Sequence, residues 1–267
     1  MNVNERIAAL RRLMEEKGID IYIVPTADFH QSEYVGEYFK ARKYITGFSG
    51  SAGTAVITKE EAKLWADGRY FIQAAAQLEG SCVELMKMGE PGVPALDEYV
   101  KQTIREGGTI GFDGRVVTMA EGCGYQETAK AKNGRVLYEE DLIGQIWEDR
   151  PEMSREPVFA LDIKYAGETT ESKLRRIREV MKECGATSHV LTTLDDICWT
   201  LNIRGNDIEF FPLVLSYLII TEKHVKLYID ESKLSEEIKA GFAKDGITVH
   251  PYNDIYEDIR HLGREEV

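Results

Sequence analysis

The chain has 267 residues, more than one typical domain of roughly 100–200 residues, so we expect two domains. Hydrophobic residues make up 43% and charged residues 30%, an ordinary composition for a folded protein with real cores. The formal net charge is −13 and the sequence has no basic stripe, which argues against a nucleic-acid partner because binding to phosphates needs clustered Lys and Arg.

The first predicted elements are a helix and a strand within residues 6–28. Apolar residues recur at helical spacing up to Gly18, and glycine at that place can take the left-handed conformation that closes a helix. A short apolar strand follows and ends near Thr26 and Asp28, two residue types that favour turns. The sequence therefore predicts a helix, then a strand, at the start of the chain.

Strands and helices alternate through the rest of the first half. Two short apolar runs, 55–58 and 64–67, predict a β-hairpin. After it we expect, in order, a helix at 69–78, a strand at 82–88, a helix at 93–106, a strand at 109–112, a helix at 118–132 and a strand at 135–138. This alternation indicates a mixed, largely parallel sheet with helical cover.

The second half repeats the plan of the first. Residues 173–195 align without gaps with residues 6–28, and Gly185 falls opposite Gly18. Three further segments match in the same order: 199–205 with 44–50, 218–221 with 55–58, and 227–230 with 64–67. We therefore predict an α/β fold made of two tandem, duplicated domains, each a mixed β-sheet flanked by helices.

The join between the two copies lies after Trp147, where residues 148–152 are polar and include a proline. We place the boundary near residue 158, with domain I over residues 1–158 and domain II over residues 159–267. The segment 261–267 looks like the approach to another strand, and we expect the natural protein to continue beyond it.

Three features bear on the compartment. The longest apolar run, around residues 210–220, is interrupted by Pro212 and suits a buried strand rather than a membrane span, which needs about 18 or more apolar residues. The N-terminus leads directly into a charged helix without the apolar core of a signal peptide. The four cysteines are scattered with no CxxC pair, so we expect reduced, mostly buried thiols in a cytoplasmic protein with no membrane partner.

The densest glycine cluster, residues 47–53, fits neither of two catalytic motifs. A P-loop needs GxxxxGK[ST] opening a helix, but no Lys follows in register and the next segment is a predicted strand. A nucleophile elbow needs GxSxG at a strand-to-helix turn, and the surroundings of Ser49 lack that spacing. We interpret the cluster as a tight connection between backbones, and a hydrolase using Ser49 or Ser51 is disfavoured.

The segment Asp67-Gly68-Arg69-Tyr70 joins a predicted strand to a helix, so it lies at the carboxyl end of a strand, where α/β folds often place ligands. Turn chemistry explains Asp67 as a cap and Gly68 as the bend, but it does not need Arg69. The second copy keeps the aspartate, as Asp230, and replaces Gly-Arg by Glu-Ser. Two interpretations stay open: a solvated arginine, or a guanidinium that binds a carboxylate or carbonyl bidentately.

His30 and Glu33 stand at i, i+3 spacing, compatible with one helical face and a metal ion. A single pair without further ligands is a weak signal, so we favour a surface or loop hydrogen-bonding role for His30 and predict no metal site. The other histidines are isolated, and no nucleophile–base pair can be argued for His189, His224, His250 or His261.

Several motifs occur together in a fixed order. They are residues 27–34, TGFSGSAGTAVIT at 46–58, LWADGRYFIQAA at 64–75, the junction at 146–151, and LDDICWTLNIRGNDIEFFPLVLSYLIIT at 194–221. As a set they resemble the N-terminal region of cytosolic Xaa-Pro aminopeptidases, the creatinase/prolidase family. The resemblance runs over nearly all of the chain, and the order of the motifs makes it specific.

The resemblance implies two creatinase-type N-terminal domains ahead of a third, "pita-bread" domain. That domain holds two divalent metals, usually manganese, on two Asp, one His and two Glu ligands, and no residues here match it. The resemblance thus implies no catalytic residue and no metal ligand in this chain, which alone should be inactive. From the D-G-R-Y motif it carries over Arg69 as a substrate-binding residue, which we expect Asp67 and His30 to support.

Two functions follow from these observations. In the first, the chain is the non-catalytic, substrate-gating region of a metal-dependent aminopeptidase that removes the N-terminal residue from peptides with proline second. Its expected partners are short Xaa-Pro peptides, its own C-terminal catalytic domain and a second copy of the parent in a homodimer. In the alternative it is a stand-alone peptide- or protein-binding module without peptidase activity, because creatinase-like domains also occur in non-enzymatic peptide- and histone-binding proteins.

Overall fold

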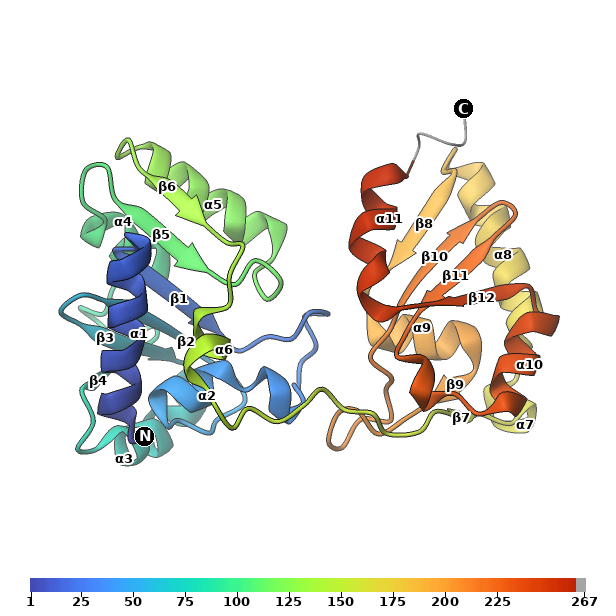
Figure 1. The fold of residues 1–267 in the computed structure, drawn as a ribbon, viewed down its shortest axis with the longest axis horizontal. Coiled ribbons are helices and arrows are strands. Elements are labelled where there is room, and N and C mark those ends of the chain that lie inside the picture. Colours follow the sequence, from blue (N-terminus) through green and yellow to red (C-terminus); the bar gives the residue numbers. More distant parts are fainter. Residues whose placement is uncertain (263–267) are drawn as a thin grey trace. The chain divides into compact units, whose positions relative to one another are not determined.

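The computed structural model describes residues 1–262 and divides the chain into two compact units, Met1–Glu152 and Met153–Val267 (Figure 1). Within the described residues, no helix is long and apolar enough to cross a membrane.

The first unit is built on a six-stranded sheet in the order β4-β3-β2-β1-β5-β6 (Figure 1). Its strands are β1 (Ile21–Pro25), β2 (Thr54–Thr58), β3 (Ala62–Ala66), β4 (Val83–Lys87), β5 (Thr109–Phe112) and β6 (Arg135–Leu137). Strand β2 runs antiparallel to both neighbours, while the other three pairs are parallel, so the sheet is mixed as predicted.

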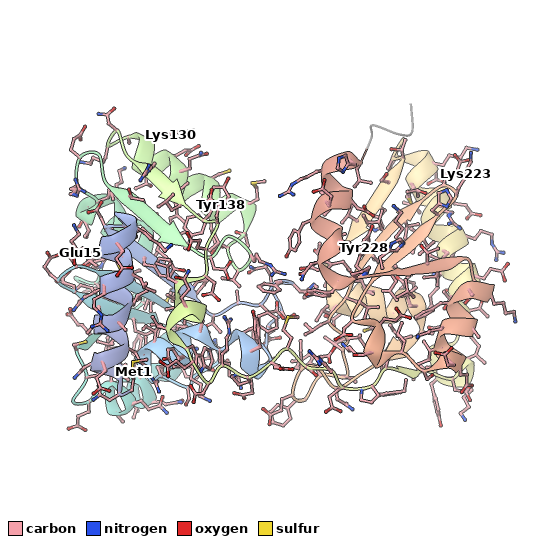
Figure 2. All side chains as sticks on the ribbon, viewed as in Figure 1. Met1, Glu15, Lys130, Tyr138, Lys223 and Tyr228 are labelled. Atoms are coloured by element: carbon pink, nitrogen blue, oxygen red, sulfur yellow. The ribbon has the colours of Figure 1, made fainter. Side chains whose placement is uncertain are left out.

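Helices cover both faces of this sheet. One face packs against α1 (Val3–Lys17), α2 (Ala41–Thr46), α3 (Phe71–Leu78) and α6 (Leu142–Ile146), and the other against α4 (Leu96–Thr103) and α5 (Met119–Lys130). Along β1, Tyr22 faces the first cluster and Ile23 the second, as the two-residue period of a strand requires. Charged side chains such as Glu15 and Lys130 lie on the outer surface (Figure 2). Short 3₁₀ turns occur at η1 (Glu37–Phe39) and η2 (Gly68–Tyr70).

The second unit has a four-stranded sheet in the order β12-β11-β10-β8. Its strands are β8 (Ser188–Leu191), β10 (Tyr217–Thr221), β11 (Val225–Tyr228) and β12 (Ile247–His250). The pairing directions match those of β1, β2, β3 and β4, with β10 antiparallel to both neighbours and β11 parallel to β12. Strands β5 and β6 have no counterpart among the described residues of this unit.

The remaining elements of the second unit flank its sheet. They are the helices α7 (Ile163–Ala166), α8 (Thr170–Glu183), α9 (Leu194–Leu201), α10 (Glu236–Lys244) and α11 (Ile255–His261), and the 3₁₀ turns η3 (Glu231–Lys233) and η4 (Tyr252–Asp254). A separate two-stranded pair joins β7 (Phe159–Ala160) to β9 (Ile203–Arg204).

The duplication holds at the level of single hydrogen bonds. Residue pairs that the sequence alignment equates have the same register, with Ala55 opposite Leu64 in one hairpin and Leu218 opposite Leu227 in the other. The helices are tied to the hairpins in the same way, because Arg11 Nε donates to the Thr58 carbonyl (2.9 Å) and Arg178 Nε to the Thr221 carbonyl (3.0 Å). The prediction of two duplicated α/β domains is therefore confirmed.

Helix closure follows the predicted glycines. Gly18 closes α1 with φ +66°, and Gly185 follows the end of α8 with φ +67°. Both take the left-handed conformation that glycine adopts without a side-chain clash. At its start, α1 has a capping box in which Asn2 accepts a hydrogen bond from the Glu5 N–H.

Two sequence predictions need correction, and a third is left untested. The buried strand expected around 210–220 is confined to β10, because the chain turns before it: Phe210 has φ +68° and is 85% exposed. Of the cysteines, only Cys198 is buried, since the other three lie at helix ends, in a turn or on an exposed helix face. The segment 261–267, expected to approach another strand, falls outside the described residues except at its start, where His261 ends α11.

Candidate functional site

The candidate site lies at the carboxyl end of β3, where Asp67 begins the 3₁₀ turn η2. Asp67 has extended backbone, and its Oδ1 accepts a hydrogen bond from the Arg69 N–H at 3.0 Å. A short acidic side chain at this position caps the exposed N–H groups of the turn. The chain is thereby bent so that Arg69 emerges at the surface, with 69% of its side chain exposed.

The guanidinium of Arg69 is held by the same aspartate that caps the turn. Nε donates to Asp67 Oδ1 at 2.9 Å and Nη2 donates to Oδ2 at 2.9 Å, a bidentate pair. Hydrogen bonds from Arg69 lower the pKa of Asp67, and Asp67 in turn raises the pKa of Arg69, so both groups stay charged. Asp67 accepts hydrogen bonds from two of the five N–H groups of the Arg69 guanidinium. A ligand carboxylate or carbonyl could accept from the others.

The glycine cluster forms a loop that is fastened beside this turn. Ser51 Oγ lies 2.7 Å from the Tyr70 hydroxyl, and Ser49 Oγ accepts from Gln77 Nε2 at 2.8 Å. A Cβ on Gly53 would lie 2.9 Å from the backbone oxygen of Trp65, so backbone does pass close to backbone, as predicted. Neither serine contacts a base: their partners are a phenol and amides, which do not accept the proton of a nucleophilic serine.

Arg42 of α2 organises the inside of the same loop, and sequence reasoning missed it. It is 3% exposed; Nε donates to Thr26 Oγ1 at 2.8 Å, and Nη1 and Nη2 donate to the carbonyls of Phe48 and Gly50. Burial lowers its pKa to about 10. The repeat alignment offered one signal, because the aligned position in the second copy is an apolar isoleucine.

His30 belongs to a separate turn, not to a helix as its spacing with Glu33 allowed. The Asp28 carboxylate accepts from the backbone N–H of His30 at 2.8 Å and of Ser32 at 2.9 Å, and Gln31 has φ +57°. His30 is 6% exposed, so the surface position proposed for it is wrong, although a loop setting is right. No group of three or more His, Cys, Asp or Glu able to hold a metal ion occurs among the described residues.

The second copy repeats the cap and omits the arginine. Asp230 Oδ1 accepts from the Ser232 N–H at 3.0 Å, and the turn η3 follows as η2 does in the first copy. The position equivalent to Tyr70 is Lys233, whose ammonium pairs with Asp207 in the interior, with side-chain exposures of 1% and 0%. The turn therefore needs the aspartate but no arginine two residues after it, since that position is Ser232 in the second copy. An exposed arginine from outside the turn, Arg155, lies at ion-pair distance from Asp230, with Nε 3.6 Å from Oδ2.

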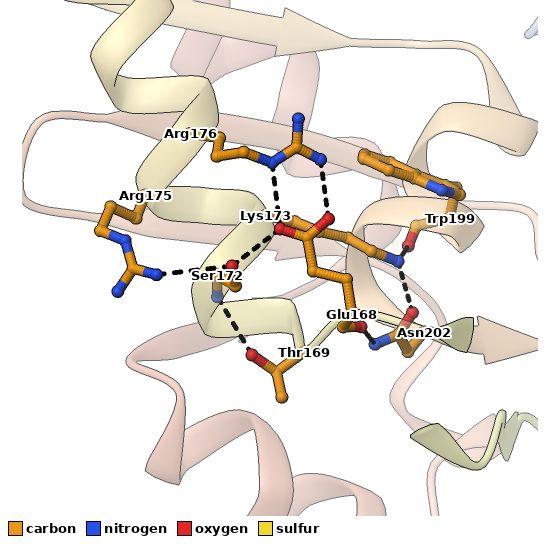
Figure 3. A network of polar contacts seen from close by, with 8 residues as sticks. All are labelled: Glu168, Thr169, Ser172, Lys173, Arg175, Arg176, Trp199 and Asn202. Atoms are coloured by element: carbon orange, nitrogen blue, oxygen red, sulfur yellow. Dashed lines mark hydrogen bonds and ion pairs between the residues drawn. The ribbon is translucent and has the colours of Figure 1, made fainter. Parts of the chain in front are cut away.

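A second cluster of polar residues lies on α8 and the end of α9 (Figure 3). Lys173 Nζ donates to the Trp199 carbonyl and to Asn202 Oδ1, each at 2.6 Å, and burial lowers its pKa. Hydrogen bonds from Arg176 and Ser172 lower the pKa of Glu168 to about 2. Lys173 is aligned with Arg6, which donates to the Tyr44 carbonyl at 2.7 Å, so the contact from this helix position to the backbone carbonyl of the aligned aromatic residue is common to both copies.

Comparison with known proteins agrees with this architecture. Two family models, each described as a creatinase/prolidase N-terminal domain, match residues 6–137 and 149–267. A probable Xaa-Pro aminopeptidase P from Pyricularia oryzae and aminopeptidase P2 from Arabidopsis thaliana are each 40% identical to the chain, over 267 and 265 residues. These alignments cover 99% and 97% of this chain but 43% and 37% of those proteins, so the chain spans about two fifths of their length.

A solved structure has the same fold over the whole length of this chain. X-prolyl aminopeptidase from Caenorhabditis elegans, described as a cytosolic enzyme with a di-nuclear active site, is 36% identical and superposes with a TM-score of 0.93. The match covers 100% of this chain and 45% of that one. The chain therefore belongs to the creatinase/prolidase N-terminal domain family and carries two such domains in tandem, as the Xaa-Pro aminopeptidases P do.

Proposed function

We propose that this chain is the substrate-gating, non-catalytic region of a metal-dependent Xaa-Pro aminopeptidase, and that Arg69 binds the peptide. The observation that carries the proposal is the exposed guanidinium that Asp67 holds bidentately, at a position of the turn where the second copy has a serine. A guanidinium fixed by Asp67 loses little conformational entropy when it meets a peptide carboxylate or carbonyl. Asp67 is the supporting residue, and we propose a further supporting role for His30, which is buried in a separate turn.

The remaining parts of the proposal concern the full-length protein. In our proposal two divalent metals, manganese, are held by a C-terminal catalytic domain outside this chain, in line with the di-nuclear active site described for the C. elegans enzyme. There they would activate the water that hydrolyses the Xaa-Pro bond. The residues of this chain would bind and orient the peptide and restrict its length. We place the protein in the cytoplasm, with short Xaa-Pro peptides as substrates and a homodimer as the parent assembly.

The test of Arg69 uses the full-length protein and an Xaa-Pro peptide. For Arg69→Ala we expect kcat/KM to fall about tenfold or more, because one charge-assisted contact contributes about 1.5–3 kcal/mol. Thermal stability should stay unchanged, since the side chain is exposed and pairs only at the surface. The matched control is Arg12→Ala, an exposed arginine on α1, which should leave both quantities unchanged. A large drop in melting temperature with normal kinetics would make Arg69 structural.

A second assay distinguishes the proposed function from the alternative, a binding module without peptidase activity. This chain alone, with added manganese, should not hydrolyse an Xaa-Pro peptide, and turnover would overturn the assignment of chemistry to another domain. If the full-length protein also fails to hydrolyse the peptide while binding it, the module is the better description.

A further inference from the structure

The second unit has a wide cavity between α8 and the turn that joins β10 to β11. Its volume is about 900 Å³, within the range of about 300–1,000 Å³ that is typical of ligand pockets. The charged side chains of its lining are four cations and two carboxylates: Arg175, Arg178, Lys182, Lys223, Glu179 and Glu222. This excess of positive charge stands out on a chain whose formal net charge is −13.

Three of the cations form a stripe along one side of α8. Arg175, Arg178 and Lys182 are spaced three and four residues apart, so they share one helix face over about 10 Å. Figure 3 shows Arg175 pointing away from the carboxylate of Glu168. Arg178 is half-buried and fixed in place, because its Nε donates to the Thr221 carbonyl at 3.0 Å. The remaining N–H groups of its guanidinium are donors for a ligand.

The fourth cation stands on a hairpin turn that hydrogen bonds hold closed. The Thr221 N–H donates to the His224 carbonyl at 2.9 Å, and the His224 N–H donates to Thr221 Oγ1 at 3.0 Å. Lys223 lies within this turn, at the outer end of the hairpin (Figure 2). Along residues 1–262, neither Lys223 nor Lys182 forms an ion pair, so the two carboxylates of the lining do not neutralise them by pairing.

The first unit has the same backbone at this place but the opposite balance of charge. The turn between β2 and β3 has the two equivalent hydrogen bonds, at 2.8 and 2.9 Å. The positions aligned with the cavity lining carry three cations and four carboxylates. In particular, Lys182 and Lys223 stand where the first unit has Glu15 and Glu60. The same helix and turn thus form with either balance, so folding does not account for the positive lining.

We propose that this cavity binds a small soluble ligand that carries at least two phosphate groups. More than one group is needed because cations spread over about 10 Å of α8 cannot all reach a single phosphate. Arginine can bind two phosphate oxygens at once, and lysine adds a point charge. A nucleic acid or an acidic membrane surface is disfavoured, because the formal net charge of −13 repels both. This proposal does not depend on the role of Arg69.

The experiment titrates tripolyphosphate into this chain and measures the heat of binding. We expect one binding site, and inorganic phosphate should bind at least tenfold more weakly than tripolyphosphate. Arg178→Gln should weaken tripolyphosphate binding at least tenfold, because the variant loses a charge-assisted contact. The matched control is Arg11→Gln, which removes the aligned arginine and its equivalent hydrogen bond to the Thr58 carbonyl. This control should leave the affinity unchanged.

Two charge-reversed variants separate binding from folding. Lys182→Glu and Lys223→Glu place the residues of the first unit at exposed positions, so each variant should keep its melting temperature and lose most of its affinity for tripolyphosphate. Absence of tripolyphosphate binding, unchanged affinity in both variants, or equal affinity for inorganic phosphate overturns the proposal. Pelleting of the chain with phosphatidylcholine vesicles that contain phosphatidylinositol bisphosphate also overturns it, because the ligand is then a lipid headgroup. None of these measurements uses peptide hydrolysis, so their failure would leave the proposed function standing.

Discussion

Phe210 occupies a backbone conformation that a bulky side chain does not favour. It has φ +68° and is the third residue of a turn in which the Phe211 N–H donates to the Ile208 carbonyl at 3.2 Å. Gly or Asn suits that position, and a strained residue costs about 1–3 kcal/mol. The ring is 85% exposed, so burial offsets little of this cost.

Phe210→Asn should therefore raise the free energy of unfolding by about 1 kcal/mol, measured by urea unfolding of this chain. Glu209→Asn is the matched control in the same turn, where φ is not positive, and should change stability little. If Phe210→Asn destabilises the protein instead, the ring contributes contacts that outweigh the strain.

The two arginines around the glycine loop show how far sequence reasoning reaches for single residues. Comparing the two copies singled out Arg69 and its cap Asp67, because a turn needs the aspartate but not the arginine. The repeat could have pointed to Arg42 through the isoleucine at the aligned position, but its role could not be predicted, since that role comes from carbonyls that only the folded loop brings together. The i, i+3 spacing of His30 and Glu33 is compatible with a helix, but the Asp28 side chain accepts from N–H groups of that segment and holds it as a turn.

Among the secondary-structure elements, Asp20 ties the entrance of β1 to β5. Its carboxylate accepts from the Thr109 N–H at 2.9 Å and from Arg105 Nε at 2.7 Å. Burial alone would raise the pKa of Asp20, but the hydrogen bonds from Arg105 and Thr109 outweigh it and lower the pKa. The stabilising contribution is therefore present above the unfolded-state pKa of about 3.9 and is lost as pH falls through the lower folded-state value.

Asp20→Asn should lower stability at pH 7 and flatten its decline toward pH 3, because the amide cannot lose the stabilising charge. Urea unfolding at pH 7, 5 and 3 measures this slope. The matched control, Asp245→Asn, changes an exposed carboxylate at the end of α10 and should keep the slope of the unsubstituted protein. Parallel pH profiles for Asp20→Asn and the unsubstituted chain would contradict the assignment.

The elements themselves were predicted where the sequence repeats. The aligned hairpins share one register, and Gly18 and Gly185 end the two equivalent helices. Element ends were less accurate: α4 is shorter at both ends than the predicted 93–106. The function of α6 as a cover was not predicted, because five residues carry no helical period and gain their place only by packing on α1 and α2.

At the scale of the whole molecule, the two units differ in how they close the same surface. The first unit seals the face of α1 and α2 with α6 inside its own chain. In the described part of the second unit, the equivalent face of α8 and α9 lines a groove that includes Val180 and Trp199, and the residues beside it are smaller, with Ala186 and Ser188 where the first unit has Ile19 and Ile21. The stability of the first unit should therefore depend on α6, whereas the second unit should fold without a helix in that place.

This difference between the two units predicts how truncated chains with and without α6 unfold. Three buried apolar side chains of α6 contribute about 1.5–3 kcal/mol each, a sum comparable to the whole stability of a domain, about 5–15 kcal/mol. We expect residues 1–152 to fold alone with a cooperative urea transition, and residues 1–138 to lose that transition and bind the dye ANS strongly. Residues 153–267, whose described part has no helix equivalent to α6, should still unfold cooperatively. A cooperative transition of equal midpoint for 1–138 and 1–152 would show that α6 is dispensable, and the comparison between the two units would then lose its energetic basis.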